Sequence, residues 1–228
     1  MLKYDLLIFD WDGTLVDSIE RIVVCMREAA RGCGLPQRDD SQIKGIIGLG
    51  LPEAIAVLYP EVAGTGVADD FRRRYSDCYL GYEGQPSPLF PGVAHSLQRL
   101  RAAGYRLAVA TGKSRRGLDR ALRDHGWDGY FDITRCADET ASKPDPLMLR
   151  EILAYCDVCA ERALMIGDSL FDLQMAARAG MDAVAVAYGA QSMACLQTAD
   201  PLLTVECFDE FAAWLAAFES CGVDEYVG

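Results

Sequence analysis

Two aspartates stand two residues apart, at positions 10 and 12, where an apolar run of sequence ends. The run, residues 4–9, predicts a buried strand, and an acid just beyond such a strand faces the crevice in which open α/β sheets bind ligands. Asp10 can attack phosphorus as a nucleophile and form an aspartyl-phosphate. Asp12, reached around the turn at Gly13 and Thr14, can protonate the leaving alkoxide and then activate water. The spacing therefore predicts phosphoryl chemistry.

This pair of carboxylates also predicts a cation. Two carboxylates facing a phosphate dianion repel it, and an all-oxygen site beside a phosphate oxygen suits Mg²⁺. The motif has two other interpretations, a turn-capping aspartate and a calcium-binding loop. A single Asp at a strand end commonly caps a turn. Asp-x-Asp-Gly also occurs in EF-hand calcium loops, but the twelfth position of such a loop must be Glu, and here it is Arg21.

A second strand-like run ends in Thr111 and is followed by a Gly-containing turn. The Thr111 hydroxyl and the main-chain amides of Gly112 and Lys113 can point at one anion, which predicts a phosphate-binding loop. The dipole of a helix that begins near Ser114 favours negative charge at the same place. The alternative is a plain strand end followed by Ser114 as an ordinary N-cap.

Lys143 lies in the segment Ser-Lys-Pro-Asp-Pro, where two prolines hold the backbone extended and begin a helix. A compact ammonium is a suitable counter-charge for a phosphoryl oxygen and for a nucleophilic carboxylate. The chain has only four lysines, and two of them, Lys113 and Lys143, fall inside these motifs. A solvated loop lysine is the alternative.

A further apolar run, residues 163–167, is followed by Asp168 and Asp172. Asp168 is placed to be a metal ligand. Asp172, one helical turn later on the same face, can hold a metal-bound water or orient Lys143. An acid that stabilises the start of a helix through its dipole is the other interpretation of Asp172.

The motifs Asp-x-Asp-Gly-Thr, Thr-Gly, Lys-Pro and Gly-Asp-x-x-x-Asp follow one another in this order over essentially the whole chain. In this combination the sequence resembles the haloacid dehalogenase superfamily, and most of all its phosphoglycolate-phosphatase-like branch, whose members carry a helical cap between the first and second motifs. The resemblance implies a Mg²⁺-dependent phosphatase that acts on a small phosphorylated metabolite, with 2-phosphoglycolate as the substrate class. Dehalogenase members lack the acid two residues after the nucleophile, so Asp12 favours phosphate esters.

The same resemblance assigns roles. It makes Asp10 the nucleophile, Asp12 the general acid and base, and Thr111 and Lys143 the phosphate-binding pair. The implied Mg²⁺ ligands are the carboxylates of Asp10 and Asp168 and the main-chain carbonyl of Asp12. The carboxylate of Asp172 would support this metal site.

Strand-like runs at residues 5–9, 107–110, 132–135, 164–166, 183–187 and 202–205 alternate with helical patterns. This alternation predicts an α/β fold, a three-layer Rossmann-like core with a parallel sheet and right-handed crossovers. The gap between the first two runs is longer than a crossover needs. We therefore expect residues 16–88 to form an inserted all-helical cap, and residues 1–15 and 89–228 to form the core. The linkers near Val16 and at residues 85–92 are the expected hinges.

Substrate choice is expected to depend on this cap. Lys44, in a glycine-containing segment, is the candidate for binding an anionic group on the leaving portion of the substrate, and an exposed lysine without a role is the alternative. Arg115 and Arg116, which follow the phosphate-binding loop, are open candidates. Two other functions remain: a phosphosugar mutase that uses the same Asp10 and Asp12, and a catalytically silent binding protein on the same fold.

Composition narrows the classes of partner. The 228 residues carry a net charge of −12, which disfavours nucleic acid and acidic membranes as partners. There is no apolar stretch of membrane-spanning length and no signal-peptide pattern, so we expect a cytoplasmic monomer or homodimer. Nine cysteines without a secretion signal predict reduced thiols.

Overall fold

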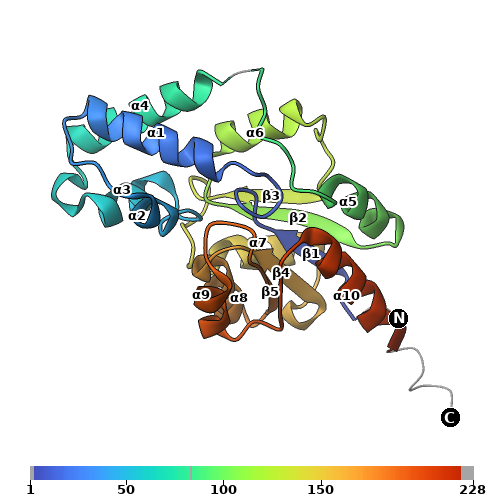
Figure 1. Ribbon diagram of the computed structural model, residues 1–228. Helices are drawn as coiled ribbons and strands as arrows, with labels where there is room; N and C mark the ends of the chain where they lie inside the picture. The colour runs from blue at the N-terminus through green and yellow to red at the C-terminus, as the bar shows by residue number, and fades with distance from the viewer. Residues whose placement is uncertain (1–2, 83, 222–228) are drawn as a thin grey trace, which may run out of the picture.

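The computed structural model describes residues 3–82 and 84–221. Six parallel strands form one sheet in the order β3-β2-β1-β4-β5-β6 (Figure 1). The strands are β1 (Leu6–Phe9), β2 (Arg106–Thr111), β3 (Ile133–Cys136), β4 (Ala163–Gly167), β5 (Asp182–Val186) and β6 (Leu203–Val205). Each lies where the apolar runs predict a strand, and β1 is in the middle of the sheet.

Helices cover both faces of this sheet, because successive side chains of a strand point to opposite faces. In β1, Leu7 and Phe9 pack beneath α5 (Val93–Ala102), α6 (Arg115–Asp124) and α10 (Phe208–Cys221). Leu6 and Ile8 pack on the other face. The helices of that face are α7 (Leu147–Cys156), α8 (Leu170–Ala179) and α9 (Met193–Leu196). The expected three-layer Rossmann-like α/β core is confirmed.

Four helices lie between β1 and α5 and stand apart from the sheet, at the upper left of Figure 1. They are α1 (Ile19–Gly32), α2 (Asp40–Lys44), α3 (Leu51–Leu58) and α4 (Gly66–Leu80). They bury a hydrophobic cluster of their own, in which Met26, Ile55 and Phe71 are at most 2% exposed. Short 3₁₀ turns at Pro60–Val62, Ala160–Arg162 and Gln197–Ala199 complete the helical elements. The insertion is therefore all-helical, as the sequence predicts.

The chain enters and leaves this insertion through two adjacent segments. Val16 and Leu89 form an antiparallel bridge. Next to it the Asp17 amide donates to the Pro88 carbonyl at 2.8 Å, and the Phe90 amide donates to the Leu15 carbonyl at 3.1 Å. The insertion is thus joined to the core by one short hydrogen-bonded ribbon.

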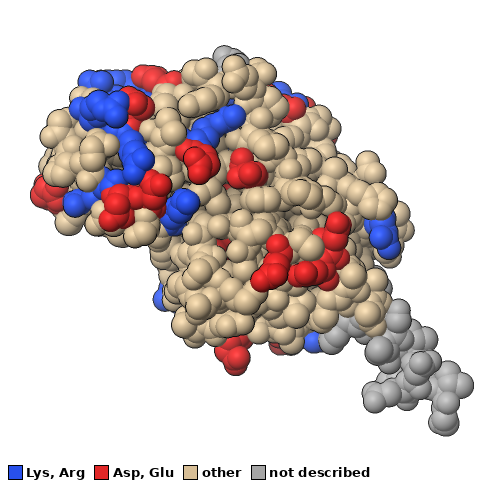
Figure 2. Space-filling model, in the orientation of Figure 1, with Lys and Arg blue, Asp and Glu red and all other residues tan. Residues whose placement is uncertain are grey.

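On the face drawn in Figure 2, charged side chains are distributed differently over the insertion and the core. Figure 2 shows basic and acidic side chains interspersed on the insertion, and acidic groups on the lower part of the core. Among the described residues, no helix is both long and apolar enough to cross a membrane.

Candidate active site

Asp10 follows β1 directly, and its main-chain amide donates to the Ile166 carbonyl of β4 at 2.9 Å. The next turn depends on Gly13, which has a φ of +81°. A Cβ atom on Gly13 would lie 2.1 Å from Oδ2 of Asp168. Glycine is therefore required twice over, by the left-handed backbone and by the close approach of the two loops. The turn brings Asp10, Asp12 and Asp168 to the same edge of the sheet, where all three are buried.

Lys143 reaches this edge and binds two of the acids. Its Nζ lies 2.6 Å from Oδ1 of Asp10 and 2.6 Å from Oδ1 of Asp172, and all three side chains are at most 1% exposed. Burial alone would lower the pKa of Lys143, but the negative charges of Asp10 and Asp172 outweigh burial and raise it. Lys143 is therefore an ammonium held between two carboxylates.

Asp172 makes both kinds of contact that the sequence left as alternatives. Its Oδ2 accepts from the Ser169 amide at 3.2 Å and from the Ser169 hydroxyl at 2.6 Å, which caps the start of α8. Its Oδ1 binds Lys143. One carboxylate thus fixes the helix start and orients the ammonium.

The oxygens of Asp10, Asp168 and Asp172 gather within 4.8 Å of one another. Burial is the main cause that raises the pKa of Asp10 to about 7. The Lys143 ammonium lowers this pKa, and the charges of Asp172 and Asp12 raise it further. Burial and the same kind of repulsion raise the pKa of Asp168. Oδ2 of Asp10 is buried and has no hydrogen-bond partner among the described residues. An unpartnered carboxylate oxygen among buried acids fits a hard divalent cation such as Mg²⁺.

Asp168 is itself held from two sides. Its Oδ1 accepts from the Thr14 hydroxyl at 3.3 Å, and its Oδ2 accepts from the Ala190 amide at 2.6 Å. The carboxylate therefore has a fixed position beside Asp10 before any cation binds.

Asp12 points to a different set of partners. Its Oδ1 lies 2.5 Å from the Ser18 hydroxyl and 2.9 Å from Nζ of Lys113. The main-chain amide of Lys113 donates to the Thr111 hydroxyl at 3.2 Å, so the backbone of Lys113 belongs to the loop after β2 while its side chain turns away to Asp12. Ser114 caps α6 by accepting from the Gly117 amide at 3.2 Å.

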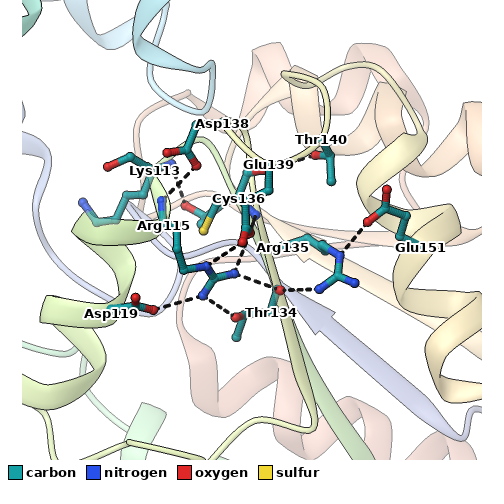
Figure 3. Close-up of polar contacts among 12 residues, drawn as sticks. Lys113, Arg115, Asp119, Thr134, Arg135, Cys136, Asp138, Glu139, Thr140 and Glu151 are labelled. Atoms are coloured by element: carbon teal, nitrogen blue, oxygen red, sulfur yellow. Dashed lines mark hydrogen bonds and ion pairs between the residues drawn. The ribbon is translucent and has the colours of Figure 1, made fainter.

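Arg115 is a structural residue of this loop (Figure 3). Its guanidinium has five N–H donors, and contacts to Glu139, Asp119 and Thr134 use all of them. The segment that Arg115 holds, after β3, also donates from the Ala137 amide to the Thr111 carbonyl at 3.0 Å. Arg115 therefore stabilises the loop after β2 through its contacts with the segment after β3.

A cavity of about 440 Å³ opens between these loops and the insertion. The core contributes Asp10, Asp12 and Lys113 to its wall, and the insertion contributes mostly apolar and aromatic side chains. The latter include Ile22, Met26, Ile46, Ile47, Leu49, Tyr75, Tyr79 and Tyr82. The cavity therefore has a charged floor and a largely apolar roof.

Comparison with known proteins places the chain in a family. The family model described as "Haloacid dehalogenase-like hydrolase" matches residues 7–186. The chain belongs to this family. Among its relatives, "Probable phosphatase IndB" of Dickeya dadantii is 34% identical over 210 residues, which are 90% of each chain. A phosphoglycolate phosphatase of Cupriavidus necator is 34% identical over 189 residues, 80% of each chain.

Solved structures agree. A haloacid dehalogenase-like family hydrolase of Streptococcus pneumoniae superposes with a TM-score of 0.81 at 25% identity, covering 94% of this chain and 99% of that one. The chain is therefore a phosphatase of the haloacid dehalogenase-like hydrolases, in the phosphoglycolate-phosphatase-like branch that the motifs indicate.

In this family member the insertion presents different residues to the cavity than the sequence suggests. Lys44, the last residue of α2, is not among the described residues that line the cavity. Among the described residues, the cations that line the cavity are Arg21 and Arg72 of the insertion and Lys113, Arg116 and Arg120 of the core. Arg21, Arg120 and Tyr79 lie in no motif, and only the packing of α1, α4 and α6 shows that they face the cavity.

The insertion is seated on the core in this structure. The Gly50 amide donates to the Ser142 hydroxyl at 2.8 Å. A Cβ atom on Gly112 would lie 2.4 Å from the Leu49 carbonyl oxygen, so the segment before α3 rests directly on the loop after β2. The cavity is accordingly roofed over the carboxylates.

Proposed function

We propose that this phosphatase hydrolyses a small phosphate monoester in a Mg²⁺-dependent reaction through an aspartyl-phosphate on Asp10, with 2-phosphoglycolate as the substrate class. The observation that carries the proposal is the carboxylate of Asp10. Lys143 holds its Oδ1 at 2.6 Å, and its Oδ2 is buried without a partner among the described residues. The phosphoglycolate phosphatases among the relatives support the substrate class.

In the first step a carboxylate oxygen of Asp10 forms a bond to phosphorus while the bond from phosphorus to the leaving oxygen breaks. Asp12 gives its proton to that oxygen, so the leaving group departs with a hydroxyl in place of an alkoxide. In the second step water attacks the aspartyl-phosphate, and Asp12 takes the proton of the water. Phosphate leaves and the carboxylate of Asp10 is restored.

Other residues of the chain bind and orient the phosphoryl group. The Thr111 hydroxyl, the amides of Gly112 and Lys113, and the Lys143 ammonium are the proposed donors to its oxygens. Asp10, Asp168 and the Asp12 carbonyl would hold Mg²⁺, with Asp172 in support. The bound cation supplies positive charge that offsets the repulsion between these acids and the phosphate.

We further propose that residues 16–88 form the cap as a unit, hinged at the ribbon where Val16 pairs with Leu89. The cap contacts the core at Gly112, in the proposed phosphate-binding loop, and at Ser142, the residue before Lys143. Closure would exclude water while the aspartyl-phosphate forms, and opening would release the product.

The test is phosphate release from 2-phosphoglycolate, sugar phosphates, nucleotides and pyrophosphate, with and without Mg²⁺. Strong Mg²⁺-dependent release from 2-phosphoglycolate is the expected result. Little free phosphate, together with stimulation by a sugar bisphosphate, would instead identify a mutase.

The role of Asp12 has a separate test in the leaving group. Asp12→Asn should slow hydrolysis of an alkyl phosphate far more than that of p-nitrophenyl phosphate, because nitrophenolate leaves without a proton. Equal losses on the two esters would count against Asp12 as the acid.

A further inference from the structure

We propose that Lys113 and Tyr79 form a carboxylate-binding pair that selects phosphate esters carrying a carboxylate on the same carbon as the ester oxygen. This inference rests on the proposed function, because it takes Asp12 as the group that protonates the leaving oxygen. It assigns the side chain of Lys113 to the leaving group of the substrate, whereas the sequence suggested the phosphate.

The position of the Lys113 ammonium carries the inference. Nζ lies 2.9 Å from Oδ1 of Asp12, and the two side chains are only 12% and 11% exposed. A general acid works within hydrogen-bond distance of the atom that it protonates. A cation in contact with that acid therefore lies within two hydrogen-bond lengths of the leaving oxygen, which is within reach of a charge on the neighbouring carbon.

Lys113 has donor capacity left for such a charge. An ammonium has three donors. Asp12 takes one, and the Tyr79 phenol, at 3.4 Å from Nζ, takes a second. Among the described residues nothing else is hydrogen-bonded to this ammonium, and Lys113 lines the cavity. The third donor is available to a substrate carboxylate without breaking the contact with Asp12.

Tyr79 supplies a second donor from the cap. It lies on α4, and burial is the main cause that raises the pKa of its phenol, so the hydroxyl keeps its proton. Since that hydroxyl accepts from Lys113, its own proton is free to donate. A cation and a hydroxyl side by side make charge-assisted bonds to a carboxylate, and burial strengthens them.

The other cations of the cavity are placed differently. Arg21 donates to the Gln85 carbonyl at 2.7 Å and lies over the Tyr82 ring. Arg72 pairs with Asp69. Arg116 and Arg120 follow one another by one turn of α6, and neither contacts Asp12. In the described part of the chain, Lys113 is thus the cavity cation that touches the proposed acid.

The experiment compares three phosphate esters on the wild-type enzyme. They are 2-phosphoglycolate, its analogue with a carboxamide in place of the carboxylate, and ethyl phosphate. We expect kcat/KM for 2-phosphoglycolate to exceed that for either ester without a carboxylate by about tenfold or more. This is the effect of one charge-assisted hydrogen bond. Lys113→Met should lower this ratio by about the same factor, and Tyr79→Phe should lower it less. The ratio cancels any general loss from disturbing Asp12.

Arg120→Met is the matched control, since it removes a cavity cation that does not contact Asp12, and the ratio should stay unchanged. Tyr79→Phe keeps the Lys113–Asp12 pair, so it remains informative if Lys113→Met fails to fold. Calorimetric binding of 2-phosphoglycolate to the Asp10→Asn variant gives a readout without turnover, and adding Lys113→Met should weaken that binding about tenfold.

Three results would overturn the inference. They are similar kcat/KM values for esters with and without the carboxylate, a ratio of these values that Lys113→Met and Tyr79→Phe leave unchanged, or a ratio that is lost in Arg120→Met. In each case the esters are still hydrolysed, so the proposed function stands. Absence of phosphate release from every ester would overturn the proposed function and this inference together.

Discussion

The floor and the roof of the cavity are built in different ways. The floor includes Asp10 and, beneath the cavity wall, the buried residues Asp168, Asp172 and Lys143, which meet Asp10 at one sheet edge and are fixed by side-chain contacts. The roof meets the core through sparse polar contacts, such as the Gly50 amide on Ser142 and Tyr79 on Lys113. The floor therefore holds its geometry before substrate binds, while substrate selection depends on how the roof is seated.

Removing the proposed nucleophile tests the floor most severely. Asp10→Asn keeps the volume of the side chain but removes the attacking oxygen and its charge, so turnover should fall by about 10⁵-fold or more. Phosphate release is the measurement, and circular dichroism checks the fold. Asp124→Asn, which changes another cavity-lining carboxylate, is the control and should keep its activity. Near-normal activity of Asp10→Asn would disprove the mechanism.

Removing Lys143 tests the stability of the buried network beneath the cavity. Lys143→Met leaves Asp10 and Asp172 buried without their partner, and we expect the free energy of unfolding to fall by about 3–5 kcal/mol without Mg²⁺. The loss should shrink as the pH falls toward about 7, because protonation of Asp10 removes the charge that Lys143 neutralises. Urea denaturation at several pH values measures both effects.

Lys44→Met is the control for that change, since the side chain of Lys44 has no hydrogen bond or ion pair to the described residues, and its carbonyl bond to the Ile47 amide is kept. It should shift stability by no more than about 0.5 kcal/mol. Equal losses in the two variants would show that the buried network does not stabilise the fold.

A methyl group at Gly112 should disturb the roof and spare the floor. Its Cβ would lie 2.4 Å and 2.6 Å from the carbonyl oxygens of Leu49 and Gly48, so Gly112→Ala pushes the cap off its seat. We expect kcat/KM to fall by about 10- to 100-fold, with a small change in stability. Gly117→Ala, whose Cβ would meet only the Ser114 hydroxyl at 3.3 Å, is the control and should be nearly silent.

The floor could be predicted from the sequence, and the roof could not. Asp10, Thr111 and Asp168 each follow an apolar strand, and the carboxyl ends of parallel strands meet at one edge, so local patterns place these residues together. The roof depends on how α1 and α4 rotate as they pack. Lys44 therefore looked suitable but does not line the cavity, whereas Arg21 and Tyr79 line it without any local pattern. The structural role of Arg115 depends on five contacts to Glu139, Asp119 and Thr134, which no local sequence pattern indicates (Figure 3).

The smallest of these effects concerns Mg²⁺ and pH. The carboxyl group of Asp10 has a folded-state pKa of about 7, above its ordinary value of 3.8, and that of Asp168 is raised as well. A raised carboxyl pKa means that the folded state holds its proton more tightly, so its contribution to stability is full below pH 3.8 and is lost as pH rises through about 7. Mg²⁺ competes with that proton. The rise in Tm caused by Mg²⁺ should therefore be slight at about pH 5 and grow until about pH 8. Thermal denaturation with Mg²⁺, against Na⁺ at equal ionic strength, measures it. A Mg²⁺ effect that stays constant over this range would mean that the cation binds away from Asp10 and Asp168, and the floor would then be held by Lys143 alone.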